Sequence, residues 1–188
     1  MPLVSIRRPL LALLLLVAGG CAAFSDDPRV RTPGVIIDDQ VIETLVKREI
    51  WKSDAAFDSA HLIAVSYNGV LLLTGQVESA ELKRKAEEIA AGLEKVRKVH
   101  NELEVGGPIS MVARANDSWL TTKVKTKMLA DAEVAARKIK VVTENGTVYL
   151  MGMLPRGEAD AAVEAARSVY GVQKIVKVFE YIDPSPGV

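Results

Sequence analysis

Apolar residues recur at helical spacing in two parts of the chain. The two sets are Ile42, Val46 and Ile50, and Leu120, Val124 and Met128. Positions four residues apart lie on one face of an α-helix, so each set predicts an amphipathic helix. An aspartate precedes each set, Asp39 in the first and Asp117 in the second. We expect each aspartate to cap its helix by accepting a hydrogen bond from a free backbone amide.

A strand, a tight turn and a second strand are predicted after each helix. The first strands cover residues 62–67 and 139–143, and Asn68-Gly69 and Asn145-Gly146 follow them. Asn-Gly favours the positive φ angles of a two-residue hairpin. The second strands are expected to stop near Gly75 and Gly152, where a missing side chain suits close backbone contact.

A second helix and a third strand complete each repeat. The apolar stripe of this helix is Leu82, Ala86, Ile89 and Leu93 in the first repeat, and Val163, Ala166 and Tyr170 in the second. The third strands cover residues 99–105 and 175–182. The order α-β-β-α-β therefore occurs twice and predicts an α+β fold. In each repeat two helices should pack on one face of a three-stranded mixed sheet.

The repeats define the domain organisation. The first domain covers residues 36–105 and the second residues 114–183, with a linker at 106–113 and a tail at 184–188. About 70 residues can bury only a modest core. We therefore expect the two domains to pack on each other.

The N-terminal 20 residues have the pattern of a secretory signal. Arg7 and Arg8 precede an apolar run at residues 10–17, which is too short to cross a bilayer. The small residues before Cys21 resemble the lipobox of bacterial lipoproteins, which implies that Cys21 is acylated and that residues 21–35 form a tether. By the same resemblance, Ala22 after the cysteine favours the outer membrane. The alternative is an ordinary cleaved signal with an incidental cysteine.

Composition narrows the possible functions. The chain has 188 residues, 49% of them hydrophobic, and 24 basic residues balance 24 acidic ones. This balance is typical of a globular protein and argues against nucleic-acid binding, which usually needs a basic excess. With one cysteine and two histidines, the sequence shows no metal-ligand spacing and no catalytic motif. We expect neither an enzyme nor a cofactor.

Both repeats resemble BON domains in their Asn-Gly hairpin, the glycine of the second strand and the late hydrophobic strand. The most specific stretches are residues 116–124, 143–146 and 150–152, and residues 80–82 and 101–102 also fit. The resemblance covers nearly all of the chain after the signal. It implies a two-domain outer-membrane lipoprotein that faces the periplasm and supports envelope integrity. It also implies that the first helix of the second domain contacts anionic phospholipid.

The candidate lipid site is Trp119, Leu120, Lys123 and Lys127. At about 100° per residue, Trp119 lies about 140° from the centre of its helix's apolar face, beside Lys123 and Lys127. An indole ring prefers the headgroup region of a bilayer, and lysines there meet phosphate. The second domain has 11 basic and 9 acidic residues, the first 9 and 13, which also favours the second domain for anionic lipid.

Three alternatives remain open. Trp119 could pack against the first domain or the linker, with the lysines merely solvated. The protein could be a lipid-anchored adaptor that docks other envelope proteins. It could also be a periplasmic stress chaperone, which would require Cys21 to be unlipidated.

Overall fold

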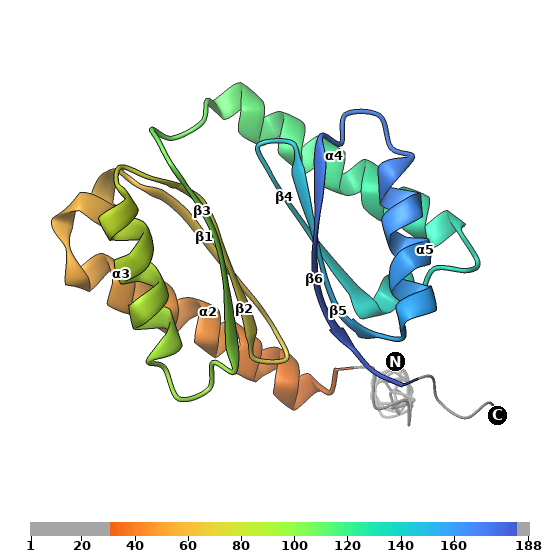
Figure 1. Cartoon of the computed structure of the whole chain (residues 1–188), viewed down its shortest axis with the longest axis horizontal. Helices are drawn as coiled ribbons and strands as arrows, with labels where there is room; N and C mark the ends of the chain where they lie inside the picture. Colours follow the sequence, from red (N-terminus) through yellow and green to blue (C-terminus); the bar gives the residue numbers. More distant parts are fainter. Residues whose placement is uncertain (1–30, 184–188) are drawn as a thin grey trace, which may run out of the picture. The chain divides into compact units, whose positions relative to one another are not determined.

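The computed structural model describes residues 31–183, which belong to one compact unit that begins at Arg31 (Figure 1). Domain 1 consists of α2 (Pro33–Ser53), the short 3₁₀ helix η1 (Ala55–Ser59), β1 (His61–Tyr67), β2 (Val70–Val77), α3 (Ala80–Ala91) and β3 (Lys98–Val105). Domain 2 consists of α4 (Met111–Ala130), η2 (Ala136–Lys138), β4 (Ile139–Glu144), β5 (Thr147–Leu154), α5 (Arg156–Arg167) and β6 (Lys174–Tyr181). Apart from the two short 3₁₀ helices, the predicted order α-β-β-α-β is confirmed in each domain.

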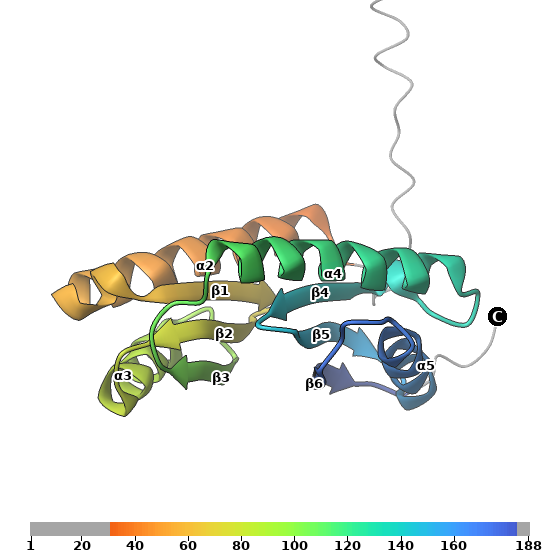
Figure 2. The ribbon, with the colours of Figure 1, turned by 90° about the horizontal axis from the view of Figure 1, so that it is seen from above.

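Each domain has one three-stranded mixed sheet, as the repeat predicted. β2 pairs antiparallel with β1 and parallel with β3, and β5 pairs in the same way with β4 and β6. Both helices of a domain cover the same face of its sheet (Figure 1). Seen from above, α2 lies along β1 and α4 lies along β4 (Figure 2). Helix α4 begins at Met111, inside the segment 106–113 that we expected to be a linker.

The expectation that Asp39 and Asp117 cap their helices is wrong. The helices begin earlier, and the side chains of Thr32 and Ser110 accept the capping hydrogen bonds. Asp39 is buried inside α2, and its carboxylate accepts hydrogen bonds from the backbone amides of Asn68 and Gly69, at 2.9 and 3.0 Å. The aspartates therefore tie the first helix of a domain to its hairpin turn.

Asp117 repeats this contact in α4. Its carboxylate accepts hydrogen bonds from the amides of Asn145 and Gly146, at 2.8 and 2.9 Å. Both turns have positive φ angles at their Asn-Gly pairs, which confirms the predicted hairpins. The amides that the aspartates bind are those that a two-residue hairpin leaves unpaired and that burial would otherwise make costly.

Burial and hydrogen bonding act against each other on the Asp39 carboxyl group. Burial raises its pKa, while hydrogen bonds from Gly69, Ser66, Asn68 and Arg31 lower it. The hydrogen bonds prevail, and the pKa lies below its ordinary value of 3.8. Asp39 is therefore a buried anion at neutral pH.

The predicted helix stripes form the cores, with one exception. Ile42, Val46 and Ile50 are buried on one face of α2, and Leu120, Val124 and Met128 on one face of α4. In α5, Val163 and Ala166 are buried as expected. Tyr170 was wrongly included in this stripe: α5 ends at Arg167, and the Tyr170 side chain is 94% exposed. The helical period no longer applies beyond the end of the helix.

A third core lies between the two sheets. It joins the faces that the helices leave uncovered, through Val65, Tyr67, Val70 and Leu72 of domain 1 and Tyr149, Met151 and Val178 of domain 2. Residues in a strand point alternately to opposite faces, so one strand can supply both its own domain's core and this one. The expectation that the domains pack on each other is confirmed.

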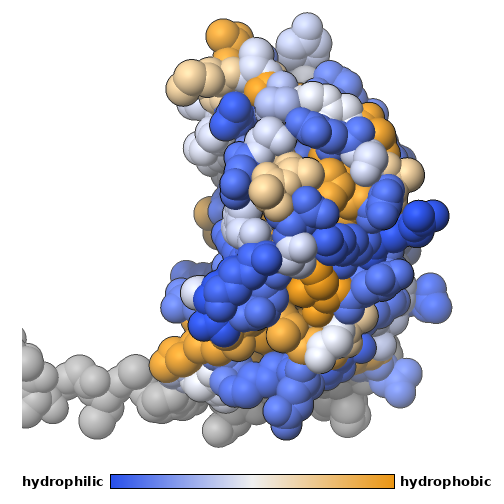
Figure 3. All heavy atoms as spheres, turned by 90° about the vertical axis from the view of Figure 1, so that its left-hand side faces the viewer, coloured by the Kyte–Doolittle hydropathy of each residue, from blue (hydrophilic) through white to orange (hydrophobic). Residues whose placement is uncertain are grey.

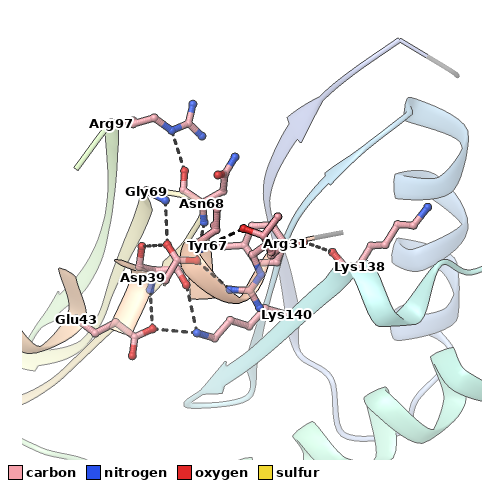
Figure 4. A network of polar contacts seen from close by, with 12 residues as sticks. Arg31, Asp39, Glu43, Tyr67, Asn68, Gly69, Arg97, Lys138 and Lys140 are labelled. Atoms are coloured by element: carbon pink, nitrogen blue, oxygen red, sulfur yellow. Dashed lines mark hydrogen bonds and ion pairs between the residues drawn. The ribbon is translucent and has the colours of Figure 1, made fainter. Parts of the chain in front are cut away.

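Polar contacts surround this third core (Figure 4). The Tyr67 hydroxyl donates to the backbone oxygen of Lys138 at 2.8 Å, and the Lys140 ammonium donates to Glu43 at 2.9 Å. Arg31 donates to Asp39 at 2.9 Å and lies over the Tyr67 ring, 4.2 Å from its centroid. The first residue of the compact unit is thus held at the contact between the domains.

Candidate lipid-binding surface of the second domain

Helix α4 presents neighbouring residues to opposite environments. Trp119 is 62% exposed, whereas Leu120 is 5% exposed and belongs to the core of domain 2. Successive residues are about 100° apart on a helix, so when Leu120 faces the sheet Trp119 must turn toward solvent. The interpretation in which Trp119 packs against domain 1 does not match its exposure. Leu120 is less suited to contact lipid than we expected, because its side chain is already buried.

A pocket opens beside Trp119. Its volume is about 240 Å³, and its lining includes Trp119, Leu120 and Lys123 from α4 together with residues of the turn before β6. From that turn Tyr170, Gly171 and Gln173 contribute, and Asn116 of α4 also lines the pocket. Three of the four predicted lipid-site residues therefore lie at one pocket. Lys127 lies one turn further along α4, exposed and outside the lining.

Lys123 connects the helix to the turn before β6. Its ammonium donates a hydrogen bond to the backbone oxygen of Tyr170 at 2.9 Å. A β-carbon added at Gly171 would lie 3.7 Å from the Lys123 ammonium and 3.6 Å from Leu120. Any side chain at residue 171 would therefore enter the space that forms the pocket.

The charge on this surface is positive and largely unneutralised. Among residues 31–183, no ion pair involves Lys123, Lys125 or Lys127. Asp117 lines the pocket, but its two oxygens already accept hydrogen bonds from the hairpin amides. The lysines are consequently available to an anionic ligand.

Domain 1 provides a natural comparison, because Asp39 and Asp117 place the two first helices in register. Val41 and Leu45 of α2 correspond to Trp119 and Lys123. Lys95 stands where domain 2 has Gly171, and its ammonium pairs with Asp38 at 2.6 Å. The helix-covered side of domain 1 is mainly hydrophilic, with smaller hydrophobic areas (Figure 3). Domain 1 thus lacks the exposed aromatic ring, the cation beside it and the glycine.

The other predicted positions have structural roles or fall outside the described residues. Cys21 lies outside them. Gly75 and Gly152 lie near the ends of β2 and β5, two residues before the last residue of each strand, and each has a carbonyl oxygen of the neighbouring chain segment against it. Trp51 donates from its indole nitrogen to the Phe57 backbone oxygen at 2.9 Å and packs on the core of domain 1.

Residues 31–183 contain neither a cluster of metal ligands nor a membrane-spanning helix. No group of three histidine, cysteine, aspartate or glutamate side chains there is arranged to hold a metal ion. No helix in this part of the chain combines the length and the apolarity needed to cross a bilayer.

Sequence reasoning missed the part of the pocket that comes from the turn before β6. Tyr170 was assigned to the core by extending a helical period, Asn116 was noted only within a stretch that resembles BON domains, and Gln173 was not singled out. The glycine at 171, after the aromatic residue, was the one sequence feature that marked this turn. The contact between α4 and the turn joins residues 47 positions apart, which local patterns do not reveal.

Comparison with known families identifies the two repeats. A model of the BON domain matches residues 38–107 and 116–183. The chain belongs to the BON-domain family. The pocket and the exposed tryptophan lie in BON domain 2, and the Lys95–Asp38 ion pair lies in BON domain 1.

The chain is also similar to three proteins over most of its own length and most of theirs. It is 41% identical over 167 residues to the outer membrane lipoprotein DolP of Haemophilus influenzae, covering 89% of this chain and 86% of that protein. It is 42% identical over 156 residues to the 21 kDa hemolysin of Actinobacillus pleuropneumoniae, covering 83% and 79%. It is 31% identical over 152 residues to osmotically-inducible protein Y of Escherichia coli, covering 79% and 75%. This chain is therefore a two-BON-domain relative of a cell-envelope lipoprotein.

Proposed function

We propose that this protein is an outer-membrane lipoprotein, anchored through Cys21 and facing the periplasm, which binds anionic phospholipid through BON domain 2 and supports envelope integrity. The anchor is supported by the lipobox-like sequence and by the similarity to the Haemophilus influenzae lipoprotein. A protein held at a membrane by acyl chains needs only modest additional affinity to keep one face against it.

The observation that carries the lipid-binding proposal is the exposed Trp119 on a helix face whose lysines make no ion pair within residues 31–183. An indole ring half-immersed in the headgroup region keeps its N–H hydrated while its ring leaves water. Each lysine near an anionic surface adds about 1 kcal/mol of attraction. The four predicted contacts divide into three exposed or half-exposed side chains, Trp119, Lys123 and Lys127, and the buried Leu120 that supports them.

Vesicle binding tests this proposal. The chain from residue 22 onward contains the whole compact unit and can be mixed with vesicles of phosphatidylcholine, with or without phosphatidylglycerol. We expect binding only to the anionic vesicles, and we expect it to weaken as salt rises, because surface charges are screened within about 10 Å at 0.1 M salt. Sedimentation with the vesicles measures the bound fraction.

Three variants make the test specific. Trp119→Ala combined with Lys123→Glu should abolish binding, whereas Val41→Ala at the equivalent position of BON domain 1 should leave it unchanged. Tryptophan emission should shift to the blue with anionic vesicles in the wild type and not in Trp119→Phe. Unchanged binding by the double variant would overturn the site.

The same measurements separate the two alternative functions. A protein adaptor predicts a saturable protein partner and no change in Trp119 emission with lipid. A stress chaperone predicts a protein whose Cys21 carries no acyl chain, which the intact mass decides.

A further inference from the structure

We infer that the pocket between Trp119 and Tyr170 holds one phosphodiester group, so that BON domain 2 binds lipid by taking a single headgroup into a defined site. The inference rests on the proposed function and adds a defined binding site to it, because attraction to a charged membrane surface does not by itself require a pocket. The ligand chemistry is a phosphodiester of glycerol, which either a lipid headgroup or a free glycerophosphodiester supplies.

Size favours a small group. The pocket volume of about 240 Å³ is below the range of about 300–1,000 Å³ that is typical of sites for whole small-molecule ligands. It is several times the ~30 Å³ that one water molecule occupies in the liquid. A phosphate with a short polyol fits between these limits, and acyl chains would stay outside.

The lining supplies donors suited to a phosphate. The Lys123 ammonium has three N–H donors, of which one binds the Tyr170 backbone oxygen. The side-chain amides of Asn116 and Gln173 line the same space, and neither makes a hydrogen bond within residues 31–183. A phosphate that accepts from the ammonium and the two amides would form charge-assisted hydrogen bonds, which are stronger than neutral ones.

Tyr170 contributes to the site from the turn before β6. Its ring is the most exposed of the large hydrophobic side chains in the described part of the chain, at 94%. A side chain of this kind in a short turn contributes nothing to the core, and its backbone oxygen is already held by Lys123. Trp119 and Tyr170 thus both line the pocket from separate elements, and their exposed aromatic side chains suit the polar–apolar boundary of a bilayer.

BON domain 1 has the same backbone arrangement without the pocket's chemistry. The amide of Arg97 donates to Gly69 and that of Gln173 donates to Gly146, so the two turns correspond. By this correspondence Glu94 replaces Tyr170, and Asp38 with its Lys95 partner replaces Asn116 and Gly171. Glu94 is acidic, and the two cations of this surface, Lys95 and Arg97, are already paired with Asp38 and Glu180, so the domain 1 surface is unsuited to a phosphate. The difference is confined to side chains, which indicates a specialised site rather than a property of the fold.

The test uses a soluble ligand and vesicles in parallel on the chain from residue 22 onward. The soluble probe is glycerophosphoglycerol, the phosphatidylglycerol headgroup without acyl chains, titrated to millimolar concentration while amide chemical shifts are recorded. We expect saturable shifts at Asn116, Gly171 and Gln173. The vesicles are phosphatidylcholine with phosphatidylglycerol.

Two variants carry the same change of charge on the same helix. Asn116→Asp places a carboxylate at the pocket, as Asp38 does in domain 1, and Ser118→Asp places one outside the pocket lining. Because Asn116→Asp replaces a donor by an anion, we expect it to weaken vesicle binding by about tenfold. Ser118→Asp should weaken it by less than about twofold, as expected for an exposed charge. Tyr170→Ser should weaken vesicle binding while leaving the thermal melting temperature unchanged.

Each outcome separates this inference from the proposed function. Vesicle binding without saturable shifts, with equal effects of the two aspartate variants, would overturn the pocket and leave lipid binding by charge and Trp119. Saturable shifts without vesicle binding would keep the pocket for a free glycerophosphodiester and overturn the lipid function. Neither binding nor shifts would overturn both.

Discussion

Replacing Gly75 by alanine should be one of the most damaging single substitutions in domain 1. A β-carbon at Gly75 would lie 2.9 Å from the carbonyl carbon of His61, and closer still to its oxygen, on the paired strand β1. The residue also has φ of +114°, which residues with a side chain rarely adopt. The crowding against His61 costs about 1–3 kcal/mol, and the positive φ angle costs about 1–3 kcal/mol for a residue with a side chain. We therefore expect the free energy of unfolding to fall by about 4 kcal/mol.

Gly152 occupies the same place in domain 2 and separates the two effects. An added β-carbon there would lie 2.8 Å from the Lys138 carbonyl oxygen, but its φ is not positive. Gly152→Ala should therefore cost only the crowding, about 1–2 kcal/mol. Gly157, on the first turn of α5, has no atom within 4 Å of its added β-carbon. Gly157→Ala should be neutral or stabilise the chain by up to about 1 kcal/mol, because alanine favours helices.

Urea unfolding followed by circular dichroism measures the three free energies on the chain from residue 22 onward. The expected order of stability is Gly157→Ala, then Gly152→Ala, then Gly75→Ala. A domain stable by about 5–15 kcal/mol should lose much of its stability in the last variant. The reasoning is refuted if Gly75→Ala unfolds like the wild type, or if Gly152→Ala proves the more damaging of the two.

Three further substitutions test the buried aspartate and the contact between the domains. Asp39→Asn should lower the free energy of unfolding by about 2 kcal/mol at pH 7. The pKa of Asp39 is lower in the folded than in the unfolded protein. The extra stability of the wild type over Asp39→Asn should therefore be fully present above the unfolded pKa of about 3.9 and should shrink as pH falls through the folded pKa. A difference in the free energy of unfolding that does not change with pH would contradict this. Tyr67→Phe removes the hydrogen bond to the Lys138 backbone oxygen and should lower the free energy of unfolding by about 1 kcal/mol in the same assay. An unchanged free energy of unfolding would show that this hydrogen bond does not stabilise the fold. Leu72→Ala, in the core between the sheets, should cost about 2–5 kcal/mol by calorimetry, and a smaller loss would indicate domains that hardly depend on each other.

The sequence alone determined the elements and their duplication. Asn-Gly turns and four-residue spacing in the helices are local signals, each set by the conformational preferences of a few consecutive residues. They predicted two mixed sheets, each with two helices on one face. The outward direction of Trp119 was also predictable, because it follows from helix geometry once Leu120 is assigned to the core.

The roles of the buried polar and exposed aromatic residues depend on contacts that form only when the elements pack together. Asp39 and Asp117 looked like helix caps because a cap is the usual local use of an aspartate, yet their partners lie in hairpins almost 30 residues away. Tyr170 looked like part of a core stripe until the end of α5 placed it beside Lys123. Contacts between distant segments depend on how the elements pack. A sequence pattern reports only on residues close together in the chain, so it does not predict how distant segments pack. The pocket of domain 2 is formed by contacts between such segments.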